Sequence, residues 1–156
     1  VMMKRNFLKF ALLAITALPM ISCSEDDDNS GETIINAQDL PETVQSFIGT
    51  HFPAAEYSRI EKNATAESDG SLYEISLNTN FEIDFTAEGA WVDIDGNGQE
   101  IPQGIVPETI STYVADNYSE LFITGIDTEG NGYEIDLSND LDLHFDTEGN
   151  FVKEEK

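Results

Sequence analysis

The chain repeats itself, and this constrains its fold more than any motif does. Three short segments of the first part return in the same order in the second part. They are Leu40-Pro41-Glu42-Thr43-Val44, echoed by Val106-Pro107-Glu108-Thr109-Ile110; Tyr73-Glu74-Ile75-Ser76-Leu77, echoed by Tyr133-Glu134-Ile135-Asp136-Leu137; and Phe85-Thr86-Ala87-Glu88-Gly89, echoed by Phe145-Asp146-Thr147-Glu148-Gly149. Repetition on this scale predicts two copies of one structural unit. We assign residues 36–100 to the first copy and residues 101–156 to the second, both within one domain.

Each copy changes its hydrophobic period once. Between Pro41 and Phe52 the apolar residues recur at helical spacing, and residues 106–118 repeat that pattern. After each helix, apolar and polar residues alternate, which is typical of strands with one buried face. We expect four strands in each copy, near residues 57–62, 72–78, 81–86 and 90–95, then 121–127, 132–138, 141–146 and 150–154. The pattern predicts an α+β fold with antiparallel strands.

The N-terminal segment has the pattern of a secretory signal. Basic residues flank the start of an apolar run, Phe10 to Leu18, which is shorter than the roughly 20 residues that span a bilayer. The only cysteine, Cys23, follows small and apolar residues, as at the cleavage site of bacterial lipoproteins. We therefore expect residues 1–22 to be a signal peptide and Cys23 to carry a lipid anchor. An ordinary signal peptide with an incidental cysteine is the alternative.

An acidic segment follows the cysteine. Its first residues are Ser24, Glu25, Asp26, Asp27 and Asp28. A run this polar has nothing to bury, so we expect residues 23–35 to form a flexible tether. The run also resembles the export signal that places lipoproteins on the outer face of the outer membrane in some Gram-negative anaerobes. The expected location is therefore the surface of the outer membrane, or otherwise the periplasm.

Several spaced motifs together resemble one protein family. They are Pro-Glu-Thr-Val-x-x-Phe-Ile-x-x-x-Phe-Pro at 41–53, Tyr-Glu-Ile-x-Leu at 73–77 and Glu-Ile-Asp-Phe-x-x-x-Gly-x-Trp-Val at 82–92, followed by Ile101-Pro102 and the second copy. In this order they resemble the beta-lactamase-inhibitor-like, PepSY-like proteins. The resemblance implies two tandem helix-plus-four-stranded repeats that form one continuous antiparallel sheet with helices packed on one face. It does not imply an enzyme, and it transfers no inhibitory residue to this chain.

The charge of the chain restricts its partners. The formal net charge is −24, and cleavage before Cys23 would remove three cations and no acid, giving −27. Such a charge repels nucleic acid and anionic lipid, because binding either needs a basic surface. A basic protein or divalent cations are the natural companions. We expect a monomer that reaches the membrane only through its lipid anchor, and we predict no cofactor.

Alternation along the strands also predicts a candidate binding surface. If the apolar side chains face the helices, an acidic face must lie on the opposite side of the sheet. Its candidate partner-binding residues are Glu74, Glu82, Asp84, Glu134, Asp136, Asp142 and His144. Trp91 follows a glycine turn where a bulge could switch faces, so it is either the best contact residue of this surface or a core or edge residue. The alternative for the whole face is a sheet surface that simply lies in water.

One segment has the beginning of a calcium loop. Asp93, Asp95 and Asn97 supply oxygen donors at positions one, three and five, and Gly98 stands at position six. Position twelve is Gly104, where the loop needs a bidentate Glu. We keep the three donors as weak metal candidates and take a glycine-rich linker as the alternative.

No catalytic signature accompanies these features. The two histidines lie on a predicted helix and a predicted strand, and the sequence has no Gly-x-Ser-x-Gly motif. We therefore predict a protein that is not an enzyme but a protein-binding or inhibitor-like module of the cell envelope, working through its acidic face. A cation-binding or purely structural envelope protein is the alternative.

Overall fold

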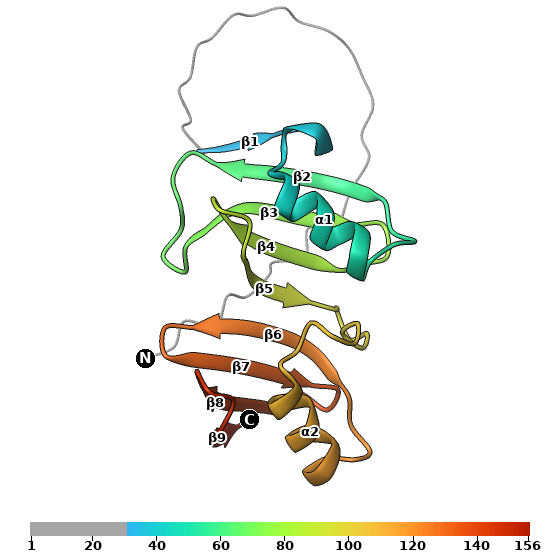
Figure 1. The fold of residues 1–156 in the computed structure, drawn as a ribbon, viewed down its shortest axis with the longest axis vertical. Coiled ribbons are helices and arrows are strands. Elements are labelled where there is room, and N and C mark those ends of the chain that lie inside the picture. The colour runs from blue at the N-terminus through green and yellow to red at the C-terminus, as the bar shows by residue number, and fades with distance from the viewer. Residues whose placement is uncertain (1–30) are drawn as a thin grey trace, which may run out of the picture.

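The computed structural model describes residues 31–156 as one open antiparallel sheet of nine strands with two α-helices (Figure 1). The strands lie side by side in chain order from β1 to β9. In sequence, the elements are β1 (Glu32–Ile34), the 3₁₀ helix η1 (Ala37–Asp39), α1 (Glu42–His51), β2 (Tyr57–Asn63), β3 (Ser71–Leu77), β4 (Glu82–Thr86), β5 (Trp91–Asp95), α2 (Glu108–Asn117), β6 (Ile123–Glu129), β7 (Gly132–Leu137), β8 (Asp142–Asp146) and β9 (Phe151–Glu155). The predicted signal peptide, Cys23 and the acidic run at residues 24–28 lie outside the described residues.

The sheet has one strand more than the eight expected from sequence. The polar composition assigns residues 32–34 to the flexible tether, but they form β1, which pairs antiparallel with β2 through Thr33 opposite Lys62. All three residues of β1 are exposed. The strand therefore exists because of backbone hydrogen bonds to the edge of β2, and not because of a buried face. Hydrophobic alternation cannot reveal such a strand.

Both helices are held by packing rather than by their ends. Pro41 and Pro107 occupy the N-cap positions of α1 and α2, and neither helix has a side-chain cap hydrogen bond. In α1, Phe47 packs edge-on against Phe85 of β4, with ring centres 5.5 Å apart. In α2, Tyr113 makes the same contact with Phe145 of β8 at 5.4 Å. Ten-residue helices are marginal in water by themselves, so docking onto the sheet stabilises them.

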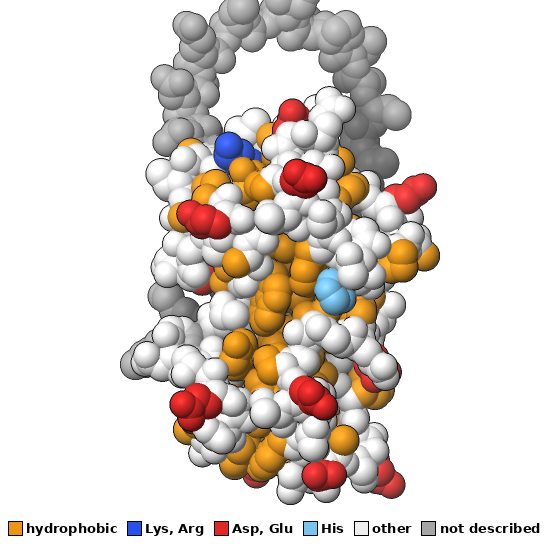
Figure 2. Space-filling view, viewed as in Figure 1, with side chains coloured by type: hydrophobic (Ala, Val, Ile, Leu, Met, Phe, Trp, Pro, Cys, Tyr) orange, Lys and Arg blue, Asp and Glu red, His pale blue; other side chains and the backbone are white. Residues whose placement is uncertain are grey.

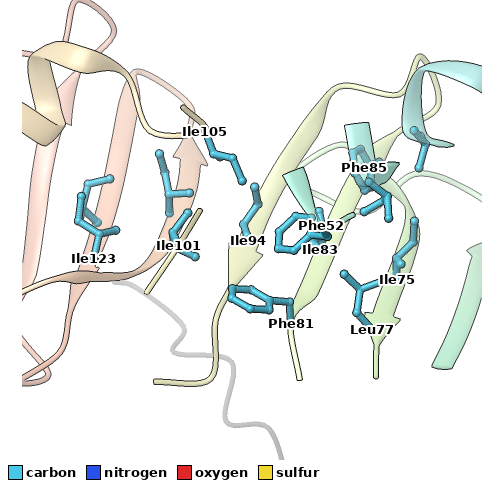
Figure 3. Packing of buried hydrophobic residues seen from close by; sticks show 14 of the residues in the cluster. Phe52, Ile75, Leu77, Phe81, Ile83, Phe85, Ile94, Ile101, Ile105 and Ile123 are labelled. Atoms are coloured by element: carbon cyan, nitrogen blue, oxygen red, sulfur yellow. The ribbon is translucent and has the colours of Figure 1, made fainter. Parts of the chain in front are cut away.

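One hydrophobic core connects the N-terminal half (residues 31–100) to the C-terminal half (residues 101–156). At the junction, Ile94 of β5 lies directly opposite Ile126 of β6, and both are buried. Figure 3 shows Ile101 and Ile105, from the segment between β5 and α2, next to Ile94. On the helix side of the sheet, hydrophobic side chains form a strip between α1 and α2 (Figure 2). Each fully buried isoleucine contributes roughly 1.5–3 kcal/mol, so the contact at the junction stabilises the pairing of the two halves.

Glycines close the turn after β4 and the turn after β8. Gly89 and Gly149 adopt φ of +85° and +82°, which residues with a side chain rarely tolerate. Their α-carbons also face the helices closely, because a Cβ added at either would meet the hydroxyl of Thr43 or of Thr109.

Neither α-helix within residues 31–156 is long and apolar enough to cross a membrane.

Candidate binding surface on the acidic face of the sheet

The face of the sheet opposite the helices is acidic. In β3, Tyr73, Ile75 and Leu77 are buried, while Glu74 and Ser76 between them are partly exposed. The same alternation holds in β4 and, from Asp93 to Asp95, in β5. Because successive side chains of a strand point to opposite faces, the polar residues share the surface that the helices leave uncovered. We call this surface the acidic face.

The strand register places carboxylates directly opposite one another across this face. Each strand from β2 to β7 contributes one residue to a continuous cross-strand series, the carboxylate row, which consists of Glu61, Glu74, Asp84, Asp93, Asp127 and Glu134. All six residues are partly buried. On β8 and β9 the series continues with two basic residues, His144 and Lys153. The acidic character therefore ends at one edge of the sheet.

The carboxylate row is electrostatically costly. Neighbouring strands are about 4.8 Å apart, so the row extends roughly 24 Å across the sheet. Like charges directly opposite each other destabilise a sheet, by up to about 1 kcal/mol for each pair. A cationic ligand on this face would offset that cost.

A second cross-strand series runs beside the first. Its members, from β2 to β9, are Arg59, Ser76, Glu82, Asp95, Gly125, Asp136, Asp142 and Glu155. Burial raises the pKa of the Glu82 carboxyl, and the nearby Asp95 and Glu74 raise it further. Burial and the two neighbouring carboxylates both disfavour the charged form of Glu82.

Between the two series lies a small hollow of about 120 Å³ in the N-terminal half. Its acidic lining residues are Glu61, Glu74, Glu82, Asp84, Asp93 and Asp95. Sites for small organic ligands usually have volumes of about 300–1,000 Å³. The hollow instead fits a cation or the tip of a basic side chain.

His144 is the buried base of the acidic face. The residue is only 7% exposed. Its Nδ1 lies 3.6 Å from a carboxylate oxygen of Glu134, and its Nε2 lies 3.1 Å from one of Glu155. Lys153 contacts the same Glu155 carboxylate at 2.6 Å, and Lys153 and His144 together lower the pKa of Glu155. Ion pairs thus lie at both ends of the acidic face, Lys153 with Glu155 on β9 and Arg59 with Glu61 on β2, and the strands between them carry the remaining carboxylates of the row.

The predicted metal donors lie on β5 and in the turn that follows it. Asp93 and Asp95 lie within β5, with Asp93 opposite Asp84, and Asn97 follows in a turn. The backbone N–H of Asn97 donates to Asp95 at 2.6 Å, while its side-chain amide donates to the carbonyl of Asn80. A different group has suitable geometry. Among the described residues, Glu134, Asp136 and Asp142 each offer one carboxylate oxygen, and these oxygens lie within 4.8 Å of one another.

Trp91 is the one predicted contact residue that the structure removes from this surface. It pairs with Phe85, at a bulge between Asp84 and Phe85, and it packs against the hydrophobic core. The bulge supplies the physical reason, because an extra residue in a strand changes which face the preceding side chain occupies. The other predicted residues lie on strands that contribute to the acidic face. They are Glu74, Glu82, Asp84, Glu134, Asp136, Asp142 and His144.

Sequence reasoning also missed members of the surface. Glu61, Asp127 and Glu155 lie on strands with weak alternation, so the sequence does not assign their faces. Asp93 and Asp95 enter the sequence-based interpretation only as loop donors. Both lie on the strand predicted at residues 90–95, and their spacing of two, with Ile94 between them, was the signal that could have placed them on the acidic face.

The chain is similar to known proteins at the level of family and fold. The sequence profile described as "Putative beta-lactamase-inhibitor-like, PepSY-like" matches residues 29–78 and 71–153. No curated protein sequence matches the chain significantly.

Three crystal structures are similar to this chain, and the match covers almost the whole length of each. The first is described as a "putative periplasmic protein of unknown function" from Bacteroides vulgatus, with 27% identity and a TM-score of 0.74, covering 81% of this chain and 100% of that one. The second is described as a "putative calcium-regulated periplasmic protein" from Bacteroides thetaiotaomicron, with 26% identity and a TM-score of 0.74, covering 80% and 97%. The third, another "putative periplasmic protein" from Bacteroides vulgatus, has 28% identity and a TM-score of 0.75, covering 82% and 99%.

Proposed function

This chain belongs to the beta-lactamase-inhibitor-like, PepSY-like family, and from that premise we propose that it is a non-catalytic module of the cell envelope that binds a basic segment of another protein on its acidic face. The carboxylate row is the observation that carries the proposal. Six acidic residues opposite one another cost stability, and a row of lysine or arginine side chains would offset that cost on binding.

Long-range attraction adds to this recognition. The net charge of −24 steers cationic partners toward the molecule and repels anionic ones. Charge of this kind raises the rate of encounter more than it raises affinity, so binding should weaken steeply with salt. The partner that fits is an extended or helical segment with several cations and few carboxylates.

Affinity capture from envelope extracts tests the proposal. Two variants with the same net charge are compared with the unchanged chain. They distinguish binding at the acidic face from binding at the rest of the surface. The face variant carries Asp84→Asn, Asp93→Asn and Asp127→Asn. The control carries Glu42→Gln, Glu108→Gln and Glu120→Gln, all outside the carboxylate row. We expect the unchanged chain and the control to retain the same basic protein at low salt, and the face variant to lose it. A partner held equally by all three proteins, or held equally at low and high salt, would contradict the proposal.

A divalent cation is a second candidate ligand, favoured by one observation in the C-terminal half. Glu134, Asp136 and Asp142 offer three carboxylate oxygens close enough to share one ion. The equivalent residues of the N-terminal half are Glu74, Ser76 and Glu82, where a serine replaces one carboxylate. The description of one similar structure as calcium-regulated is consistent with this candidate.

Calcium titration separates the two candidates. Calorimetry of the unchanged chain should give a saturable isotherm if the cation site exists. Asp136→Asn should abolish it, while Asp95→Asn, in the sequence-predicted loop, should leave it intact. Absence of heat at millimolar calcium would rule out the second candidate and leave the first untouched.

We also propose that the protein is an envelope lipoprotein. The similar structures are described as periplasmic proteins, and the N-terminal pattern predicts export and a lipid on Cys23. Residues 24–28 would then direct it to the outer face of the outer membrane. Membrane fractionation of a Cys23→Ala variant tests the anchor, because the protein should become soluble. Accessibility of the unchanged protein to protease on intact cells tests the side of the membrane.

The proposal treats the two halves as tandem copies of one helix-plus-four-strand unit, with both helices on one face. Equivalent positions support this interpretation, because Val44 and Ile110 are both fully buried, as are Ile75 and Ile135. Duplication explains how a small unit produces an acidic face long enough for an extended partner.

A further inference from the structure

At the junction between the halves, β5 pairs with β6. The outer strands of two copies of the chain could pair in the same way. β5 pairs antiparallel with β6, with Asp93 opposite Asp127, Ile94 opposite Ile126, and Asp95 opposite Gly125. β9 is the last strand of the sheet, and within residues 31–156 it pairs only with β8. Its outer edge therefore presents backbone donors and acceptors to solvent.

β9 is the counterpart of β5 in the C-terminal half. Trp91 opposite Phe85 and Phe151 opposite Phe145 each mark a bulge at the same place in the pairing. The strands differ in burial. Val92 of β5 is 2% exposed, whereas its equivalent, Val152, is 60% exposed. The covering neighbour makes the difference, since the carbonyl of Val92 accepts a hydrogen bond from Thr128 of β6.

β2 is likewise the counterpart of β6. Ile60 lies opposite Ile75 as Ile126 lies opposite Ile135, and both isoleucines of each pair are buried. In this structure the outer edge of β2 is covered by β1, whose three residues are all exposed. The β1 segment contacts β2 from Ile60 onward, because Ile34 lies opposite Glu61 and the backbone N–H of Ile35 donates to the carbonyl of Ile60. This cover is short and buries little.

Transferring the β5–β6 register to β9 and a second copy's β2 gives complementary charges. Lys153 falls opposite Glu61 of the second copy, and Glu155 falls opposite Arg59 of the second copy. At the first of these positions the internal junction has Asp93 opposite Asp127, and at the second it has Asp95 opposite Gly125. Two of the few cations of this acidic chain thus lie where they would pair across the contact.

The groups involved can exchange partners. Arg59 contacts Glu61 within β2 at 2.6 Å, and Lys153 contacts Glu155 within β9 at the same distance. Arg59, Lys153 and Glu155 are each about half exposed, so these ion pairs contribute little to stability and replacing them with pairs between copies costs little. Opposite charges directly across antiparallel strands are favourable.

We propose that copies of this chain associate head to tail, with β9 of one copy paired antiparallel to β2 of the next in place of that copy's β1. The contact is heterologous, so it can repeat along an open series. Each contact would continue the sheet and the acidic face from one copy into the next. The proposal departs from the monomer expected from sequence, and it does not depend on the proposed protein partner.

Glu154 sets the strength of this contact. It would lie opposite Ile60 of the second copy, at the place where the internal junction pairs two isoleucines. In this structure its carboxylate accepts a hydrogen bond from Tyr118, at 2.8 Å, which raises the pKa of Tyr118 to about 12. An inward-facing charge on an edge strand weakens edge pairing. The association should therefore be weak and reversible.

Analytical ultracentrifugation of residues 24–156 at physiological ionic strength tests the proposal. We expect the average mass of the unchanged chain to rise with concentration. Lys153→Glu and Glu61→Lys should each weaken association by roughly 3- to 30-fold, because each places like charges in opposition. The double variant has the net charge of the unchanged chain and should regain its association. An equimolar mixture of the two single variants should also regain it.

Further variants distinguish pairing at the β9 edge from a general effect of charge. Glu120→Lys changes the net charge as Glu61→Lys does, at an exposed site away from both edges, and should not weaken association. Deleting residues 31–34 should strengthen association by uncovering β2, and Glu154→Ile should strengthen it as well. Circular dichroism checks that each variant is folded. If the unchanged chain and the deletion variant both stay monomeric, or if the double variant and the mixture associate no better than the single variants, the proposal is wrong.

Discussion

β5 and β9 pair with β4 and β8 in the same register, each with a bulge at Phe85 or Phe145, yet β5 has buried side chains and every residue of β9 is exposed. Val92 and Ile94 of β5 are buried, whereas Val152 of β9 is largely exposed and Glu154 stands where Ile94 does. The residues beneath the helices show no such contrast, because Ile83 and Phe85 are as buried as Leu143 and Phe145. Each half therefore buries its own residues beneath its helix. In contrast, the burial of the outer side of β5 or β9 depends on whether another strand pairs with it.

Charge differs between the halves in the same way. In the N-terminal half, Asp84 and Asp93 lie opposite each other in the carboxylate row. The equivalent pair in the C-terminal half is His144 and Lys153. Basic residues therefore appear where the sheet ends, which discourages unwanted pairing at that edge but permits pairing with an acidic one.

The largest effect should come from the core residues beneath each helix. Phe85→Ala and Phe145→Ala should each lower the free energy of unfolding by about 3–5 kcal/mol, because each leaves a cavity beneath a helix. Urea denaturation, followed by Trp91 fluorescence and by circular dichroism, should show a single transition for both variants. Phe122→Ala, at an exposed side chain, serves as the control and should cost less than about 0.5 kcal/mol. Two separate transitions would show that the halves unfold independently.

The turn glycines test whether the halves are equivalent at their helix contacts. Gly89→Ala and Gly149→Ala should each destabilise by about 2 kcal/mol, because of the positive φ and of contact with Thr43 or Thr109. Gly104 has φ of +88° with open space around it, so Gly104→Ala should cost only the backbone part, about 1 kcal/mol. Thermal unfolding of the three variants measures this difference. Unequal effects at Gly89 and Gly149 would argue against equivalent packing.

The comparison of β5 with β9 predicts a smaller loss of stability, which should appear for a substitution in β5 but not in β9. Val92→Ala should destabilise by about 1.5 kcal/mol, through lost burial and a small cavity. Val152→Ala should change stability by less than about 0.5 kcal/mol in a dilute sample. Urea denaturation at micromolar concentration gives both values. Equal losses would mean that the edge of β9 is covered in solution.

The smallest effect concerns charge on the acidic face. The raised pKa of Glu82 means that its contribution to stability is present below its unfolded pKa and is lost as pH rises through its folded pKa. Glu82→Gln should therefore stabilise the fold at pH 7, by less than about 1 kcal/mol because the group is screened by solvent. The gain should vanish near pH 4, where Glu82 itself is protonated. Glu120→Gln is the control, and a stabilisation that persists at low pH would contradict the electrostatic origin of the effect.

Much of the architecture could be predicted from local pattern. The helical spacing of Val44 and Ile48 and the alternation around Ile75 identified helices and strands to within a few residues. The single open antiparallel sheet with two helices, implied by the family resemblance, is also what the structure shows. These features depend on periods of 3.6 and 2, which are properties of short segments.

Local pattern failed wherever the outcome depended on a neighbouring strand. The face of Trp91 changed with a bulge, and β1 formed only because the edge of β2 was available to it. Neither the bulge nor the free edge leaves a hydrophobic period in the sequence.

The sequence alone determined which side chains are apolar, how often they recur and that the chain carries a large negative charge. Which carboxylates stand opposite one another at the junction between the halves was set by the packing of strands that are distant in the chain. Asp93 of β5 and Asp127 of β6 are far apart in the chain, and the register that joins them is set by the packing of Ile94 against Ile126. Cross-strand register is a nonlocal property, because a shift of one residue would turn every side chain to the other face. The acidic face therefore owes its composition to the sequence and its geometry to the fold.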